Sequence, residues 1–254
     1  MTLIVTIVNE LGLLQLSDSE LTAPDTGEPV GTGTKLFPLV FCRGALAVAG
    51  SYVMNGTGMD DWMPQAIAEY SALDTGSVEG FARFLQHRLT EQQERGITGM
   101  LVQIAGYVRD DRGSHPEMWF VRNFDGIDPA NGDYVGRSND FGISEDYWDR
   151  EYGKLLEGGH VPGQPLPSVF FFNGVAEGRI SFKLLNRYYL QFLEETWRQP
   201  ALGFSKPTSI EDYAQLMKHE LEIIASLFRV NKLNGIGGDV QHYAIPRPKD
   251  VVVL

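Results

Sequence analysis

The chain has 254 residues and carries 33 acidic against 21 basic side chains, a net charge of −12 at neutral pH. This negative balance makes a nucleic-acid backbone or an anionic membrane surface an unfavourable partner. The single cysteine, Cys42, cannot form an intrachain disulfide and cannot by itself build a zinc site, which favours a reducing, cytoplasmic environment.

The opening quarter of the chain is expected to consist mainly of strands. Residues 3–8 form a β-branched run that is apolar on both alternating faces, and a second run at 13–16 completes a buried hairpin. The segment 17–34 contains turn-forming residues without periodicity and is interpreted as a loop. Two more apolar runs follow, at 36–41 and 45–49.

The apolar stretch at residues 3–16 is not interpreted as a signal peptide. It has no basic leader, and Asn9 and Glu10 interrupt it. No later segment reaches the uninterrupted apolar length of about 20 residues that a membrane-spanning helix needs. The sequence therefore predicts a soluble protein that does not act at a membrane.

Two helices are expected next. The first follows Asp60 and Asp61, which are placed to cap it, and the second begins after Ser77 and ends at Gly96. Apolar residues at helical spacing support both helices. They are Met63, Ile67 and Tyr70 in the first and Phe81, Phe84, Leu85 and Leu89 in the second.

Strands are expected to return at 100–108 and 118–121, and the pair Asn131-Gly132 indicates a hairpin turn. Residues 138–167 are rich in glycine, proline and acidic groups and are interpreted as an irregular insertion. The run at 168–172 is typical of a buried strand.

The last third of the chain shows helical spacing from 180 to 197, stopped by Pro200, and again from Ser209 to Leu227. A final strand is expected at 239–245. No internal repeat and no convincing linker divides the sequence. We therefore expect one domain that spans residues 1–254.

The order of elements indicates the fold class. Strands and helices come in blocks, whereas a parallel sheet would require alternating βαβ units. The order favours an α+β protein, a four-layer αββα sandwich of two antiparallel sheets flanked by helix pairs.

Four residues near the N-terminus occur in an informative order. Thr2 opens the first apolar run, Asp18 follows it by sixteen residues, Lys35 by thirty-three, and Gly50 ends the run at 45–49. Together they resemble the start of a proteasome β-type subunit, with the Lys displaced by one position. The resemblance covers about the first 50 residues and implies the fold of the N-terminal nucleophile hydrolases, which is the same αββα sandwich.

The resemblance implies a threonine peptidase or amidohydrolase in which Thr2 is the nucleophile once Met1 is removed. The α-amine of an N-terminal residue, with a pKa of about 7.7–8.0, can then accept the hydroxyl proton. Asp18 and Lys35 would lower the cost of forming the alkoxide, and the N–H of Gly50 would donate to the oxyanion. A peptide or small amide would be the substrate.

The resemblance further implies a ring of identical subunits, with an unfoldase as a further partner, and no metal or organic cofactor. The five histidines show no metal-ligand spacing, which agrees with the expectation that no metal is bound.

Two positions depart from the pattern of active proteasome subunits. Leu233 and Ile236 stand where an Asp and a Ser are expected before the pair Gly237-Gly238, and a further Ser in the middle of the chain is not identified. An alternative therefore stays open, in which the chain has the same fold but is a catalytically inactive subunit that serves as an assembly or binding module.

Overall fold

The computed structural model describes residues 2–23, 26–73, 77–92, 99–111, 113–128, 134–144 and 168–249. These residues form a mixed α+β structure in which antiparallel strands and helix pairs follow one another in blocks, as the sequence predicted. The predicted helix end at Gly96, the turn at Asn131-Gly132 and most of the insertion at 138–167 lie outside the described residues.

A four-stranded sheet contains both ends of the described chain, in the order β14-β1-β2-β15 with every neighbouring pair antiparallel. Its strands are β1 (Leu3–Asn9), β2 (Gly12–Asp18), β14 (Val169–Gly174) and β15 (Val240–Pro246). The predicted N-terminal hairpin is confirmed, because β1 and β2 pair with Ile4 opposite Ser17 and Asn9 opposite Gly12.

A five-stranded antiparallel sheet has the order β13-β10-β9-β6-β5. Its strands are β5 (Leu36–Leu39), β6 (Arg43–Gly50), β9 (Met100–Asp110), β10 (Gly113–Arg122) and β13 (Gly142–Ser144). The short β13 shows that the start of the predicted insertion at 138–167 pairs with this sheet.

Three two-stranded ribbons lie at the margins of the sheets. They are β3 (Glu20–Thr22) with β4 (Pro29–Thr32), β7 (Val53–Met54) with β8 (Thr57–Gly58), and β11 (Gly126–Ile127) with β12 (Tyr134–Val135). The loop predicted at 17–34 is therefore wrong in part. All residues of β4 are exposed. The ribbon therefore does not need the alternation of apolar and polar residues by which a half-buried strand is recognised in a sequence.

The helices are α1 (Met59–Ser71), α2 (Val78–Gln92), α4 (Ala176–Trp197) and α5 (Ile210–Val230), with a short 3-10 helix η1 at Pro200–Leu202. Ser209 caps α5 by accepting a hydrogen bond from the Asp212 amide. The expected caps of α1 are wrong, because Gly58 is the N-cap and Asp60 and Asp61 lie in the first turn. Within the described ranges, no helix combines the length and apolar character needed to cross a bilayer.

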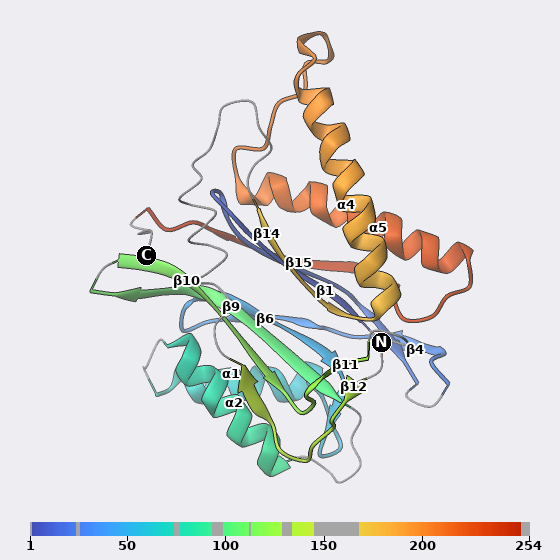
Figure 1. The fold of residues 1–254 in the computed structure, drawn as a ribbon. Helices are drawn as coiled ribbons and strands as arrows, with labels where there is room; N and C mark the ends of the chain where they lie inside the picture. The colour runs from blue at the N-terminus through green and yellow to red at the C-terminus, as the bar shows by residue number, and fades with distance from the viewer. Residues whose placement is uncertain are drawn as a thin grey trace.

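Figure 1 shows the two sheets facing one another, with α4 and α5 over the four-stranded sheet and α1 and α2 over the five-stranded sheet. A third apolar cluster fills the space between the sheets. Strand β1 contributes to two of these clusters, since Leu3, Val5 and Ile7 pack toward the helices while Ile4 and Val8 pack toward the other sheet. The two-sided apolar pattern of this strand is thereby explained.

One buried carboxyl group joins α4 to α5. Glu220 is fully buried, and the Nδ2 of Asn186 donates a 2.9 Å hydrogen bond to its Oε2. Among the described residues, its Oε1 has no hydrogen-bond partner. Burial raises the pKa of Glu220 to about 8, because water no longer stabilises the charged form.

This raised pKa predicts a pH-dependent stability. Between about pH 4.5 and pH 8 the native state holds a proton on Glu220 that the unfolded chain releases, so the free energy of unfolding should fall as pH rises through this window. We expect Glu220→Gln to gain stability relative to the wild type, by up to about 1.4 kcal/mol per pH unit across this window. Urea unfolding at pH 5, 6, 7 and 8 measures this difference.

Glu211→Gln is the matched control, because Glu211 is an exposed carboxylate on the same helix, α5. Its stability difference from the wild type should stay nearly constant with pH. A Glu220→Gln difference that is equally flat would contradict the prediction.

Candidate active site

Asp18 and Lys35 form a buried ion pair where two strands meet. Asp18 is the last residue of β2, and Lys35 directly precedes β5. The Nζ of Lys35 lies 3.1 Å from the Oδ2 of Asp18, and the two side chains are 2% and 0% exposed. The predicted association of these two residues is thus observed in the structure.

Backbone groups complete the surroundings of the pair. The Asp18 carboxylate accepts hydrogen bonds from the amides of Leu3, at 2.9 Å, and Gly237, at 3.4 Å. The Lys35 ammonium also donates to the carbonyl oxygen of Glu20. Burial raises the pKa of Asp18 and lowers the pKa of Lys35, and the attraction between the two groups opposes both shifts. Water therefore screens the attraction between the two groups only weakly.

Thr2 is adjacent to this pair through the backbone, since Asp18 holds the amide of the next residue, Leu3. Thr2 itself is 4% exposed, and its carbonyl oxygen accepts a 3.0 Å hydrogen bond from the Val175 amide. Side chains alternate along β1, and Ile4 points into the space between the sheets. The side chain of Thr2 is therefore on the face of β1 that looks toward the five-stranded sheet.

Gly174 permits a close approach of β14 to Thr2. It has φ of +111°, in the region that favours glycine, and a Cβ at this position would lie 1.7 Å from the carbonyl oxygen of Thr2. Any side chain at residue 174 would thus displace Thr2 or β14.

Gly50 lies on the facing sheet, at the end of β6 and opposite Met100 of β9. Its φ of +94° again requires glycine, and a Cβ would lie 2.0 Å from the carbonyl oxygen of Gly99. Two residues earlier, the Val48 amide donates to the carbonyl oxygen of Lys35. Gly50 is therefore near the same end of the sandwich as Asp18 and Lys35, while the assignment of its N–H to an oxyanion stays a prediction.

Gln241 was not identified from the sequence, although it fixes the backbone at Lys35. Its Oε1 accepts hydrogen bonds from the amides of Lys35, at 2.8 Å, and Leu36, at 3.2 Å, and its Nε2 donates to the carbonyl oxygen of Gly33. Gln241 lies in β15, more than 200 residues further along the chain. No local sequence pattern could reveal this contact.

A polar network between the sheets was also missed. Gln103 Nε2 donates a 2.6 Å hydrogen bond to Thr6 Oγ1, and its Oε1 accepts a 2.6 Å bond from Asn173. Gln15 donates to Thr6 and to the Gln103 carbonyl oxygen. The signal in the sequence is a set of polar residues within otherwise apolar strands, which need partners when buried.

The two departures from the family pattern have different surroundings. Ile236 is 2% exposed and belongs to the apolar cluster under α4 and α5, where its Cδ1 comes close to Gly178. Leu233 is 50% exposed. Neither side chain can hydrogen-bond to the amine of Thr2. Met1 lies outside the described residues.

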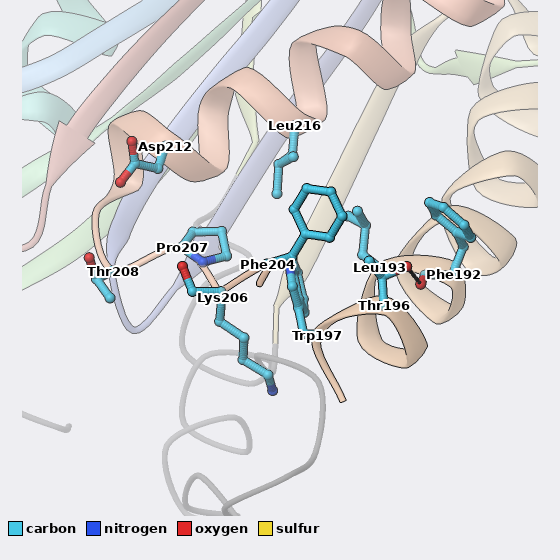
Figure 2. Close-up of a pocket in the computed structure, with 11 residues that line it drawn as sticks. Phe192, Leu193, Thr196, Trp197, Phe204, Lys206, Pro207, Thr208, Asp212 and Leu216 are labelled. Carbon is cyan, nitrogen blue, oxygen red and sulfur yellow. Dashed lines mark hydrogen bonds between the residues drawn. The ribbon is translucent and has the colours of Figure 1, made fainter. Parts of the chain in front are cut away.

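A cavity of about 570 Å³ lies at the other end of α4. Figure 2 shows part of its apolar lining, with Phe192 and Trp197 from α4, Phe204 from the connection and Leu216 from α5. Since α4 has 22 residues and rises about 1.5 Å per residue, roughly 30 Å separate this cavity from the Thr2 end of the helix. It is therefore not part of the candidate active site.

No group of three or more metal-ligating side chains is found within the described ranges. Comparison with protein-family models and with curated protein sequences finds no match for the chain.

The buried pair yields a stability prediction. Lys35→Met leaves the Asp18 carboxylate buried without its counter-charge, and we expect a loss of about 3–5 kcal/mol in the free energy of unfolding. The double variant Asp18→Asn/Lys35→Met should lose much less than the sum of the single variants, because it removes both charges. Denaturant unfolding measures all three variants.

Arg83→Met is the control for this experiment. Arg83 pairs with Glu79 at 2.7 Å on the surface of α2, where its side chain is 59% exposed. Loss of such an exposed pair should cost less than about 1 kcal/mol. An equal effect of Lys35→Met and Arg83→Met would show that the buried pair contributes no special stability.

Proposed function

We propose that the chain is an N-terminal nucleophile hydrolase of the proteasome β type, with the four-layer αββα fold of that class, and that Thr2 hydrolyses a peptide or small amide bond. The observation that carries this proposal is the buried Asp18–Lys35 pair, which is bonded to the amide directly after Thr2. A cation held beside an N-terminal hydroxyl favours the alkoxide form of that hydroxyl.

The proposed reaction has two stages. Thr2 Oγ1 bonds to the substrate carbonyl carbon while the Thr2 amine accepts the hydroxyl proton, and that proton passes to the leaving nitrogen as the C–N bond breaks. Water then attacks the resulting ester and gives a proton to the amine. That proton returns to Thr2 Oγ1 as the ester bond breaks and the acid product leaves.

Gly50 is the proposed donor to the oxyanion that forms when the carbonyl is attacked. Its position on the facing sheet, near Lys35, supports this role, since a backbone N–H held by a sheet needs no reorganisation during the reaction. The reaction requires a free Thr2 amine, and hence the removal of Met1.

The proposal includes a cytoplasmic ring of identical subunits, served by an unfoldase and independent of metal or organic cofactors. Exposed apolar side chains on α4 support self-association, since they recur every fourth residue on one face of the helix. They are Ile180, Leu184, Tyr188 and Phe192, each at least 57% exposed.

A second candidate function has a specific observation in its favour. Ile236, which stands where active proteasome subunits carry a serine, is buried in an apolar cluster and offers no polar group to Thr2. In this alternative the chain keeps the fold as an inactive assembly or binding subunit.

Intact-mass measurement with a peptide epoxyketone separates the two candidates, because this probe needs both the hydroxyl and the free amine of an N-terminal threonine. We expect a mass that lacks Met1 and one probe adduct per chain. Thr2→Ala should abolish the adduct and the hydrolysis of peptide amides. Retained Met1 without an adduct would support the inactive subunit.

Thr208→Ala is the matched control, since Thr208 is an exposed threonine beside the distant cavity. It should be labelled at the wild-type rate. Equal labelling of Thr2→Ala and wild type would overturn the proposed nucleophile.

A further inference from the structure

A second cavity of about 370 Å³ opens between the two sheets. Its walls come from β9, β10, β14 and the first turn of α4. This volume is within the range of small-molecule sites and would hold one or two amino-acid side chains.

Thr2 does not line the cavity, but it contacts the backbone directly after a wall of the cavity. Phe171 and Asn173 of β14 line it. The next residues are Gly174, which ends β14 opposite Leu3, and Val175, whose amide donates to the carbonyl oxygen of Thr2. Arg179 is one helical turn beyond Val175, and its amide donates to the Val175 carbonyl oxygen.

The direction of the side chains supports the same placement. Phe171 packs in the apolar cluster between the sheets, so Asn173 points to that side too, as its bond to Gln103 shows. Phe120 and Arg122 are two residues apart in β10 and therefore lie on the same face of that strand, toward the space between the sheets. Thr2 is on the corresponding face of β1, so its side chain and the cavity share the space between the sheets.

Two arginines, Arg122 and Arg179, line this cavity. Within the described residues, no carboxylate pairs with either of them. The Nε of Arg179 is buried and has no hydrogen-bond partner in the part of the chain that the structure describes. The guanidinium of Arg122 lies over the ring of Phe124, with 5.8 Å between Cζ and the ring centroid. Two cations without acidic partners are notable in a chain of net charge −12.

A bound carboxylate would supply the acidic hydrogen-bond partner that these arginines lack. Arginine forms paired, charge-assisted hydrogen bonds with carboxylates, whereas a buried N–H without a partner is unfavourable. The phenyl rings of Phe120, Phe124 and Phe171 provide an apolar wall for the carbon atoms of such a ligand. At an ionic strength of about 0.1–0.15 M, salt screens the repulsion between such a carboxylate and acidic side chains more than about 8–10 Å away.

We propose that this cavity is the substrate pocket beside Thr2, and that Arg122 and Arg179 select a substrate bearing a carboxylate. The carboxylate is either an acidic side chain or the free C-terminus of a peptide. That the bound molecule is a substrate rests on the proposed function. The preference of the cavity for a carboxylate does not, and a binding measurement alone can test it.

Three acetylated dipeptides serve as probes: acetyl-Ala-Glu-amide, acetyl-Ala-Gln-amide and acetyl-Ala-Gln with a free carboxylate. Their dissociation constants for the full chain are measured by calorimetry at about 0.15 M salt, where repulsion from the acidic surface is screened. We expect the Glu amide or the free acid to bind at least about tenfold more tightly than the neutral Gln amide. The tighter of the two acidic probes identifies the source of the carboxylate. Equal binding of all three overturns the proposal.

Arg179→Gln and Arg122→Gln should each remove most of this preference by weakening the binding of the acidic probe. Arg187→Gln is the matched control, because Arg187 lies on the same helix but is exposed. It should retain the preference. Loss of the preference in Arg187→Gln to the same extent would mean that general charge, and not the cavity, attracts the acidic probes. Because two arginines are tested separately, a folding defect in one variant does not prevent the test.

Failure of the proposed function is distinguishable from failure of this inference. Epoxyketone labelling reports the Thr2 nucleophile, whereas dipeptide binding reports the cavity. Carboxylate-selective binding without labelling would refute the hydrolase and support the arginine pocket. Labelling without selective binding would support the hydrolase and overturn the arginine pocket.

Discussion

The burial of the Asp18–Lys35 pair is the constraint on which the N-terminal end of the sandwich depends. Two charges removed from water are tolerable only if their partners are all in place. Those partners are the amides of Leu3 and Gly237 and the carbonyl oxygen of Glu20. The pair therefore fixes the start of β1, the end of β2, the β3–β4 ribbon and the segment before β15 relative to one another.

The same constraint explains why polar groups continue into the interior of the sandwich. The hydrogen bonds of Gln103 with Thr6 and Asn173 connect the two facing sheets. Because these bonds are directional, they fix the position of one sheet relative to the other, which apolar contacts alone would not do. Because Asn173 also lines the smaller cavity, the network sets the distance between the walls of that cavity. Rigidity between the sheets and the shape of the cavity thus have a common origin.

The block order of strands and helices and the N-terminal hairpin were predictable, because both follow from local periodicity. The Asp18–Lys35 contact was expected only as an implication of the family resemblance. The β3–β4 ribbon was not, since its strands bury no alternating face. The bonds of Gln241 to Lys35 and the convergence of Arg122 with Arg179 depend on how distant strands pair. Such contacts appear only when the sheets are assembled. The family resemblance itself stays a prediction.

The backbone bonds around Thr2 have a practical consequence for making the protein. The carbonyl oxygen of Thr2 and the amide of Leu3 are both held inside the structure, so Thr2 cannot move outward to accommodate an addition. An affinity tag fused ahead of Thr2 would keep its nitrogen in an amide bond, as Met1 does, and would begin beside the space between the sheets. Recombinant protein for any study of this end of the molecule should therefore carry its purification handle elsewhere.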